Sequence, residues 1–278
     1  MTDPGPHLLG RKPSPPDLRD YRLANFHGLG QQPALLSNQE LAVYAAGELQ
    51  KTTITYKQWA TRHYDDVTVT HWWKAFNALA QIADVVPPLP TGDKVWAADH
   101  FQLDQSAGVP DSQTGHCVGF GWAGWGDSDP VRDSYVNADG HAIYYECKVI
   151  EGQPGNEDGA YVRDGAKAML ARNRLGVYAF ADTIDTALTH LRSYGPLVVG
   201  TDWTNDMFDP DAQGFVKPTG GVAGGHCYLW YGVRGDVFDF KNSWGDWGDN
   251  GSFHMHRADF EVLFSSWGEV VASVELAL

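Results

Sequence analysis

The chain is poor in cysteine, in positive charge and in long apolar runs. Only three of its 278 residues are cysteines, and this small odd number argues against a disulfide framework. There are 20 Lys and Arg against 35 Asp and Glu, which gives a formal net charge of -15. Nucleic-acid binding normally needs a basic patch, so we expect no nucleic-acid partner. No apolar stretch approaches the roughly 20 residues of a membrane span, so we expect no membrane partner.

The N-terminus also lacks a basic start followed by an apolar run, which is the pattern of a secretory signal. We therefore expect a cytoplasmic protein in a reducing compartment. A protein carried in a virion, if the chain is phage-encoded, would show the same pattern. The sequence gives no prediction of the oligomeric state.

The composition that is present predicts a folded protein with three regions. Hydrophobic residues make up 43% of the chain and charged residues 20%, as in globular proteins. Residues 1–36 are rich in Pro and Gly and predict an extended N-terminal arm. A capping-box pattern at residues 37–40 opens a helical region, 37–93, that ends with the Pro-rich run 87–92. Residues 94–278 form the third region.

In this third region, helical patterns come first and strand patterns later, which predicts a segregated α+β fold. The predicted helices are 117–125, 138–149, 162–175, 183–193 and 258–266. The predicted strands are 196–203, 227–233, 237–243, 252–256 and 269–278.

The densest cluster of unusual residues is the run 241–251, which contains two Asn, two Trp and three Gly. Gly weakens strands and large aromatic side chains seek cover, so this composition suits no plain strand. An amide among indoles suggests a side chain that is oriented and shielded from water. His226, which follows Gly225, is the nearby side chain that Asn242 could orient.

Cys117 is the candidate nucleophile because it follows Gly115 and His116 and opens a predicted helix. The positive end of the helix dipole and the unpaired N–H groups there are expected to lower the pKa of a thiol. A thiolate needs an imidazole partner, and the imidazole needs a third group that fixes its tautomer. His226 and Asn242 supply these roles. Cys147 and Cys227 are expected to be inert buried residues, and Trp122 and Trp125 core residues.

These motifs resemble those of the papain family of cysteine peptidases, over residues 94–278. Asn242, Trp244 and the glycines after them are similar to that family's Asn-box. The Gly225–His226 pair is similar to its His-box, and residues 115–123 to its Cys-box. Residues 157–161 resemble the segment that lines the family's substrate groove, and 195–199 resemble the strand before the His.

The resemblance implies a papain-like two-lobe fold, helical and β-rich, with an N-terminal helical insertion. It implies a cysteine endopeptidase, a hydrolase that acts on peptide or protein substrates through a Cys117–His226–Asn242 triad and a thioester. No cofactor and no metal are expected. The implied substrate-binding residues are Gly159, Ala160, Gly225 and Trp244. The implied oxyanion donors are the Cys117 backbone N–H and a Gln side chain upstream.

The chain departs from the family pattern in three places. The family's Gln stands six residues before the Cys, whereas Gln105 stands twelve before Cys117 and Gln113 four before it. We favour Gln105, with residues 107–112 as a loop insertion. The family's second Cys, three before the nucleophile, is Thr114, so its disulfide is absent. The aromatic residue that usually follows the nucleophile is Val118.

The region 37–93 has no counterpart in the catalytic unit of that family. It lacks the signature of the family's helical pro-segment, and we favour an inserted subdomain over a removable propeptide. Two other functions remain open. One is a catalytically silent papain-like structural or binding module, for example of a phage particle. The other is a thiol-dependent amidase or transferase.

Overall fold

The computed structural model describes residues 9–14, 21–22, 91–108 and 115–274. All of them belong to one of two compact units of the chain, the one formed by Met1–Leu23 and Thr91–Leu278. The predicted helical segment 37–93 lies almost wholly outside the described residues, so its assignment as an inserted subdomain stays a prediction. The same holds for most of the predicted arm.

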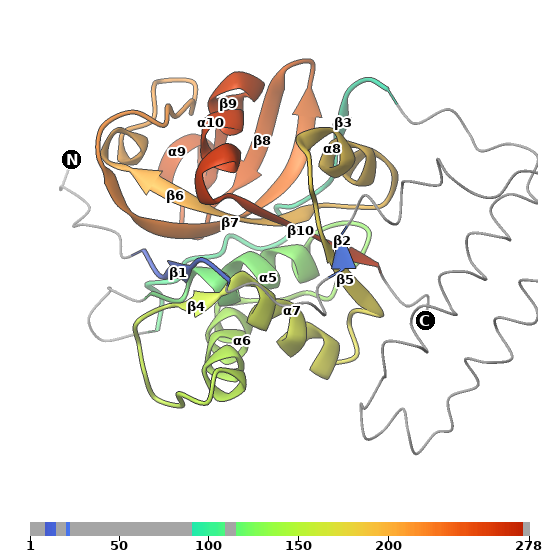
Figure 1. Ribbon diagram of the computed structural model, residues 1–278, viewed down its shortest axis with the longest axis vertical. Coiled ribbons are helices and arrows are strands. Elements are labelled where there is room, and N and C mark those ends of the chain that lie inside the picture. The colour runs from blue at the N-terminus through green and yellow to red at the C-terminus, as the bar shows by residue number, and fades with distance from the viewer. Residues whose placement is uncertain (1–8, 15–20, 23–90, 109–114, 275–278) are drawn as a thin grey trace, which may run out of the picture. The chain divides into compact units, whose positions relative to one another are not determined.

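The described part of the chain combines helices with a large, mostly antiparallel sheet (Figure 1), which confirms the predicted α+β class. Its helices are α5 (Cys117–Asp127), α6 (Asn137–Ile150), α7 (Val162–Ala171), α8 (Ile184–Ser193), η2 (Asn205–Phe208), α9 (Trp247–Asn250) and α10 (Arg257–Trp267). Its strands are β1 (Arg11–Lys12), β2 (Tyr21–Arg22), β3 (Lys94–Val95), β4 (Ala160–Tyr161), β5 (Val177–Phe180), β6 (Leu197–Thr204), β7 (Val222–Arg234), β8 (Val237–Lys241), β9 (Ser252–His256) and β10 (Glu269–Val274). Among these helices, none has the length and apolarity that crossing a bilayer requires.

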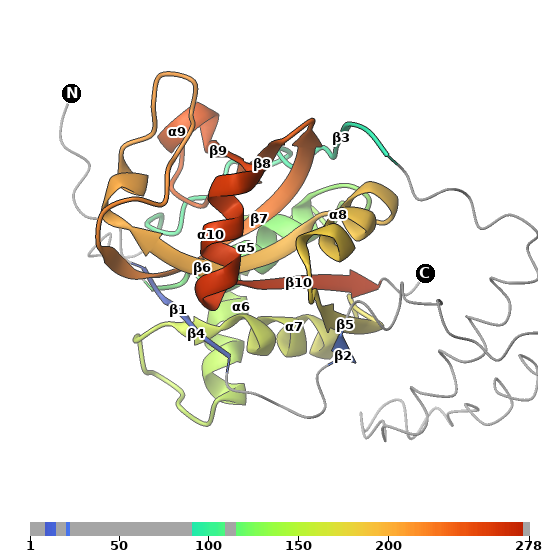
Figure 2. The same ribbon diagram turned by 45° about the horizontal axis from the view of Figure 1, so that its top comes forward.

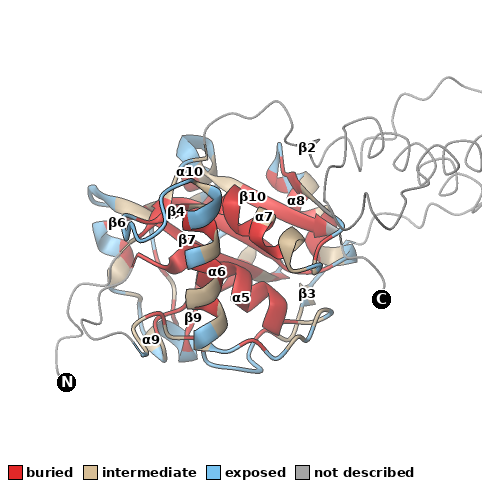
Figure 3. Ribbon diagram, turned by 90° about the horizontal axis from the view of Figure 1, so that it is seen from below, coloured by how far each residue is buried: buried red, intermediate tan, exposed pale blue. Residues whose placement is uncertain are grey.

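Helix α5 is the centre of the helical part, and every one of its residues is buried (Figure 3). It packs against α6 on one side and β7 on the other. Glycines allow this close packing, because a Cβ at Gly119 would lie 2.2 Å from the carbonyl oxygen of Gly140. Trp122 and Trp125 are 0% and 2% exposed, which confirms them as core residues.

The β-rich part is one sheet in the order β2-β5-β10-β6-β7-β8-β9, with β3 paired to β7. Large aromatic residues from β7, β8, β9 and α10 fill the space beside it, among them Tyr228, Phe240, Phe253 and Phe260. The predicted strands of this region are present, and residues 275–278 of the last one lie outside the described residues. Strand β7 begins at Val222, five residues before its predicted start, and β5 has no counterpart in the prediction.

The N-terminal segment of residues 9–14, which we call the arm segment, lies between the helical and β-rich parts. Its strand β1 pairs in parallel with β4 and packs beside β7, as Figures 1 and 2 both show for β1 and β4. An extended arm is the predicted conformation for this segment. The sequence motifs do not predict that this segment lies beside β4 and β7. Hydrogen bonds between backbone atoms form this pairing, and they leave no pattern in the side chains.

Candidate active site

Helix α5 begins at Cys117, as the sequence predicts, and the Cys117 side chain is fully buried. The thiol lies beside the backbone of Cys227, which hydrogen bonds to it. Cys227 directly follows His226 on β7. The fold therefore brings the N-terminus of α5 to the strand that carries His226, over a sequence distance of more than a hundred residues.

His226 and Asn242 form a buried hydrogen-bonded pair. Nε2 of His226 lies 2.8 Å from Oδ1 of Asn242, and the same oxygen accepts the backbone N–H of Ser243 at 2.8 Å. An amide oxygen can only accept, so the ring proton of neutral His226 resides on Nε2. The lone pair is then on Nδ1, which is the atom able to act as a base.

Aromatic rings surround this pair. The indole of Trp244 stacks on the His226 ring with a centroid distance of 4.6 Å and an interplanar angle of 26°. Trp203 meets the same ring edge-on at 4.9 Å, and Phe208 stacks on Trp244 at 5.8 Å. The apolar rings lower the local dielectric and so strengthen the hydrogen bond between His226 and Asn242. Sequence reasoning missed Trp203 and Phe208, which stand outside the Asn-box and carry no motif.

Gln105 lies beside the Asn-box. Its Oε1 accepts the hydroxyl of Ser243 at 2.9 Å, and its backbone N–H donates to the Ser243 carbonyl at 2.9 Å. The residue is 4% exposed. Because the Ser243 hydroxyl donates to the amide oxygen, the NH₂ group is the donor end of this side chain. Gln113, the competing residue, lies outside the described residues.

The arm segment occupies the place where the resemblance puts the substrate groove. The Gly10 carbonyl accepts the backbone N–H of Ala160 at 2.7 Å. A Cβ at Gly159 would lie 1.9 Å from the Gly10 oxygen, and a Cβ at Gly225 would lie 2.2 Å from the Arg11 oxygen. Three of the four predicted substrate-binding residues therefore contact the chain's own N-terminal segment, and only glycine fits at two of them.

The same segment covers the thiol. Burial raises the pKa of Cys117 to about 11, against backbone hydrogen bonds from Gly10 and Cys227 that lower it. The sequence predicts a lowered pKa from the helix N-terminus, and this expectation is wrong for the closed structure. Removing the thiolate from water raises the pKa by more than the helix dipole and the backbone hydrogen bonds of Gly10, Cys227 and Val118 lower it.

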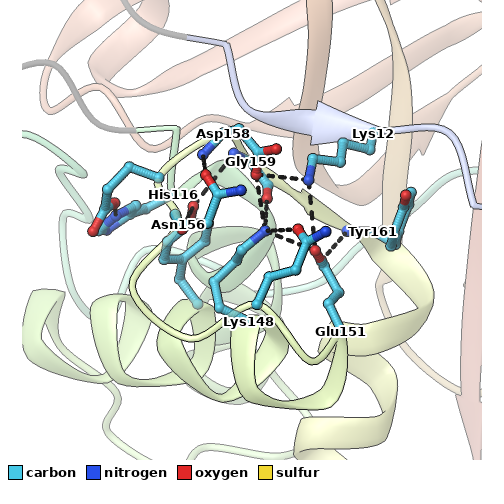
Figure 4. A network of polar contacts seen from close by, with 11 residues as sticks. Lys12, His116, Lys148, Glu151, Asn156, Asp158, Gly159 and Tyr161 are labelled. Atoms are coloured by element: carbon cyan, nitrogen blue, oxygen red, sulfur yellow. Dashed lines mark hydrogen bonds and ion pairs between the residues drawn. The ribbon is translucent and has the colours of Figure 1, made fainter.

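His116, the residue before Cys117, is 1% exposed and belongs to a polar array (Figure 4). Its Nε2 lies 2.6 Å from Glu157 and its Nδ1 lies 2.8 Å from Nδ1 of His141. His141 in turn contacts the carbonyl oxygen of Ala107 through Nε2 at 2.9 Å. Burial lowers the pKa of His116, although Glu157 opposes the shift. The array thus links His116, the residue before Cys117, to Glu157, which precedes the predicted groove residues Gly159 and Ala160.

The described residues contain no group of three or more His, Cys, Asp and Glu side chains placed to hold a metal ion. His254 and His256 alternate on β9. His254 is 5% exposed and has its Nδ1 2.8 Å from Asp239, whereas the His256 side chain is 50% exposed. Cys147 and Cys227 are buried and free, and burial raises the pKa of both thiols.

Comparison with known proteins gives likenesses of structure rather than of sequence. No family model matches the chain, and no curated protein matches its sequence. Xylellain, a cysteine protease from Xylella fastidiosa, is similar over 97% of this chain and 96% of its own, with 17% identity and a TM-score of 0.57. A procathepsin B from Trypanosoma congolense shares 13% identity over 64% of this chain and 73% of its own, with a TM-score of 0.49. The likeness to xylellain shows that the chain has the fold of a papain-like cysteine protease.

Proposed function

We propose that the protein is a cysteine endopeptidase in which Cys117 is the nucleophile, His226 the base and acid, and Asn242 the residue that orients His226. The observation that carries this proposal is the buried 2.8 Å contact between His226 and Asn242, beneath Trp244 and on the strand beside Cys117. A buried imidazole, an amide and a thiol rarely lie together in a core that has only a structural role.

The reaction follows from these roles. Nδ1 of His226 takes the proton of the Cys117 thiol, and the thiolate sulfur attacks a peptide carbonyl carbon. The tetrahedral oxyanion is held by the Cys117 backbone N–H and the NH₂ group of Gln105. The C–N bond breaks as His226 gives its proton to the leaving amine. Water, activated by His226, then cleaves the thioester and restores the thiol.

Peptide cleavage requires the arm segment to leave, because it fills the groove and buries the thiol. Gly10 gives a way to displace it, since a Cβ there would lie 1.9 Å from the carbonyl oxygen of Gly115. Backbone cannot yield at that distance, so Gly10→Ala excludes the arm from its seat. Gly221→Ala is the matched control, because its Cβ would meet only the end of the Asn205 side chain at 3.3 Å.

The test compares cleavage of a mixed peptide library by four full-length proteins. They are the natural chain, Gly10→Ala, Gly10→Ala with Cys117→Ala, and Gly221→Ala. We expect Gly10→Ala to cleave at least about tenfold faster than the natural chain and Gly221→Ala. The added Cys117→Ala substitution should abolish this activity.

A catalytically silent module gives a different result. Gly10→Ala would then leave Cys117 open to alkylation by iodoacetamide while no peptide is cleaved. A transferase would form amides with an added amine in place of free acids, which mass analysis of the products detects.

A further inference from the structure

The arm segment carries two adjacent basic residues whose side chains point to opposite sides of its strand. Successive side chains of an extended strand alternate in direction. Arg11 therefore reaches into the β-rich part and Lys12 into the helical part. Each side chain ends on a carboxylate of the part that it enters.

Arg11 is bound in a buried site. Its NH2 nitrogen lies 2.6 Å from the Glu269 carboxylate and donates to the Trp267 carbonyl at 2.6 Å. The Arg11 side chain has no exposed surface, and Glu269 retains only 14%. The guanidinium lies against Gly200 of β6, where a Cβ would meet its Nε at 2.8 Å. This site therefore holds a long cationic side chain out of water, with its charge paired through one guanidinium nitrogen.

Lys12 occupies a second site, formed by α6 and the segment before β4 (Figure 4). Its ammonium lies 2.7 Å from Asp158 and 3.5 Å from Glu151. The ring of Tyr161 lies 5.5 Å away, within reach of a cation–π contact. The contact with Lys12 is the main cause that lowers the pKa of Asp158, to about 2, so this carboxylate is ionised at any neutral pH.

The charges of the second site balance only while Lys12 is present. Lys148, which is fully buried, contacts Glu151 at 2.7 Å and Asp158 at 2.9 Å. Hydrogen bonds to these carboxylates raise the pKa of Lys148 against the effect of burial, so it is charged. Two ammonium groups thus face two carboxylates. When the arm leaves, one negative charge stays without a counter-charge, and Glu269 loses its guanidinium.

We propose that the groove selects peptides with two adjacent basic residues, one bound by Glu269 and the other by Asp158 and Glu151. The arm segment is then a copy of the preferred ligand that the chain carries itself. This inference rests on the proposed function, because it names the substrate class of the same groove. The overall charge of -15 also favours a cationic peptide over an acidic one.

Binding is measured separately from cleavage. The protein is the full chain with Cys117→Ala, and with Arg11→Met and Lys12→Met so that the arm competes weakly. Fluorescence anisotropy follows labelled hexapeptides with an Arg-Lys pair in either order. In matched peptides, citrulline replaces Arg or norleucine replaces Lys, which removes the charge and keeps the length. We expect each replacement to weaken binding about tenfold, as for one charge-assisted hydrogen bond.

Substitutions in the two sites assign the preferences. Glu269→Gln should remove the difference between Arg and citrulline and leave that between Lys and norleucine, and Asp158→Asn should do the reverse. Each ratio compares the affinities of one variant for a charged peptide and for its neutral match. A change in how tightly the arm segment binds affects both affinities equally and cancels in the ratio. Asp236→Asn, whose side chain is 74% exposed and contacts His256, is the control and should change neither ratio.

Equal affinity for all peptides, binding of none of them, or loss of both preferences in either variant overturns the inference. Thermal melts of each variant confirm that it is folded before binding is measured. The outcome is distinct from that of the proposed function. Selective binding without cleavage by Gly10→Ala keeps the dibasic groove and removes the peptidase, whereas cleavage without selectivity keeps the peptidase alone.

Discussion

The two halves of the candidate active site differ in their state. On the β-rich side, His226 is held by Asn242 at 2.8 Å, stacked under Trp244 and fixed in the tautomer that a base requires. On the helical side, Cys117 is fully buried under the arm segment, and burial raises the pKa of its thiol to about 11. One half is arranged for chemistry and the other is closed.

The difference lies in what covers each half rather than in how each is built. Trp203 and Trp244 shield the imidazole, with Phe208 stacked on Trp244, and all three belong to the sheet or to the segments beside it. The thiol is covered by the arm segment, in which Gly10 hydrogen bonds to it and Arg11 and Lys12 pair with β4. The side chains of Arg11 and Lys12 form ion pairs with Glu269 and Asp158. We expect this segment to leave without unfolding the core, which makes closure of the thiol separable from the chemistry.

The largest effect should come from removing the imidazole. In the Gly10→Ala background, His226→Ala should lower peptide cleavage by about 10²–10⁴-fold, because neither thiol deprotonation nor protonation of the leaving amine has a partner. The steady-state cleavage rate measures this effect. His256→Ala, a half-exposed His on β9, is the control and should leave the rate unchanged. Equal cleavage rates for His226→Ala and His256→Ala would contradict the role of His226 as the catalytic base of the β-rich half.

A smaller effect is expected at Gln105. In the same background, Gln105→Ala should lower kcat by about 10²–10³-fold, the loss typical of one oxyanion donor. Ser243→Ala removes only the hydroxyl that holds the Gln105 oxygen, so it should cost about fivefold. Should both substitutions cost the same small factor, Gln105 serves packing, and the donor is to be sought in the segment that contains Gln113.

The local elements could be predicted from the sequence because their signals are local. Helix α5 begins at Cys117 and β9 spans Ser252–His256, as predicted. Helical spacing and strand alternation depend on residues that are close together in the sequence. The ends of β7 were less predictable. Residues 222–226 contain two glycines and lack the pattern of a strand, yet they pair with the antiparallel neighbour β6.

The closed state of the thiol could not be predicted from the same patterns. Gly10 reaches Gly115 and Ala160 across more than a hundred residues through backbone atoms, which are common to all sequences. The Asn-box identifies Asn242 and Trp244, but nothing in it names Trp203 as the second ring on His226. Long-range packing and backbone pairing supply what local patterns leave out.

The most direct test of closure is the pH profile of Cys117 alkylation by iodoacetamide, followed by mass spectrometry of the peptide that contains it. In the natural chain the thiol stays protonated below its raised pKa. The rate should therefore rise about tenfold per pH unit above neutrality and level off only near pH 11. In Gly10→Ala the thiol pairs with His226, and the profile should level off at a lower pH with a faster rate at pH 7. Identical profiles for the two proteins would contradict closure by the arm segment.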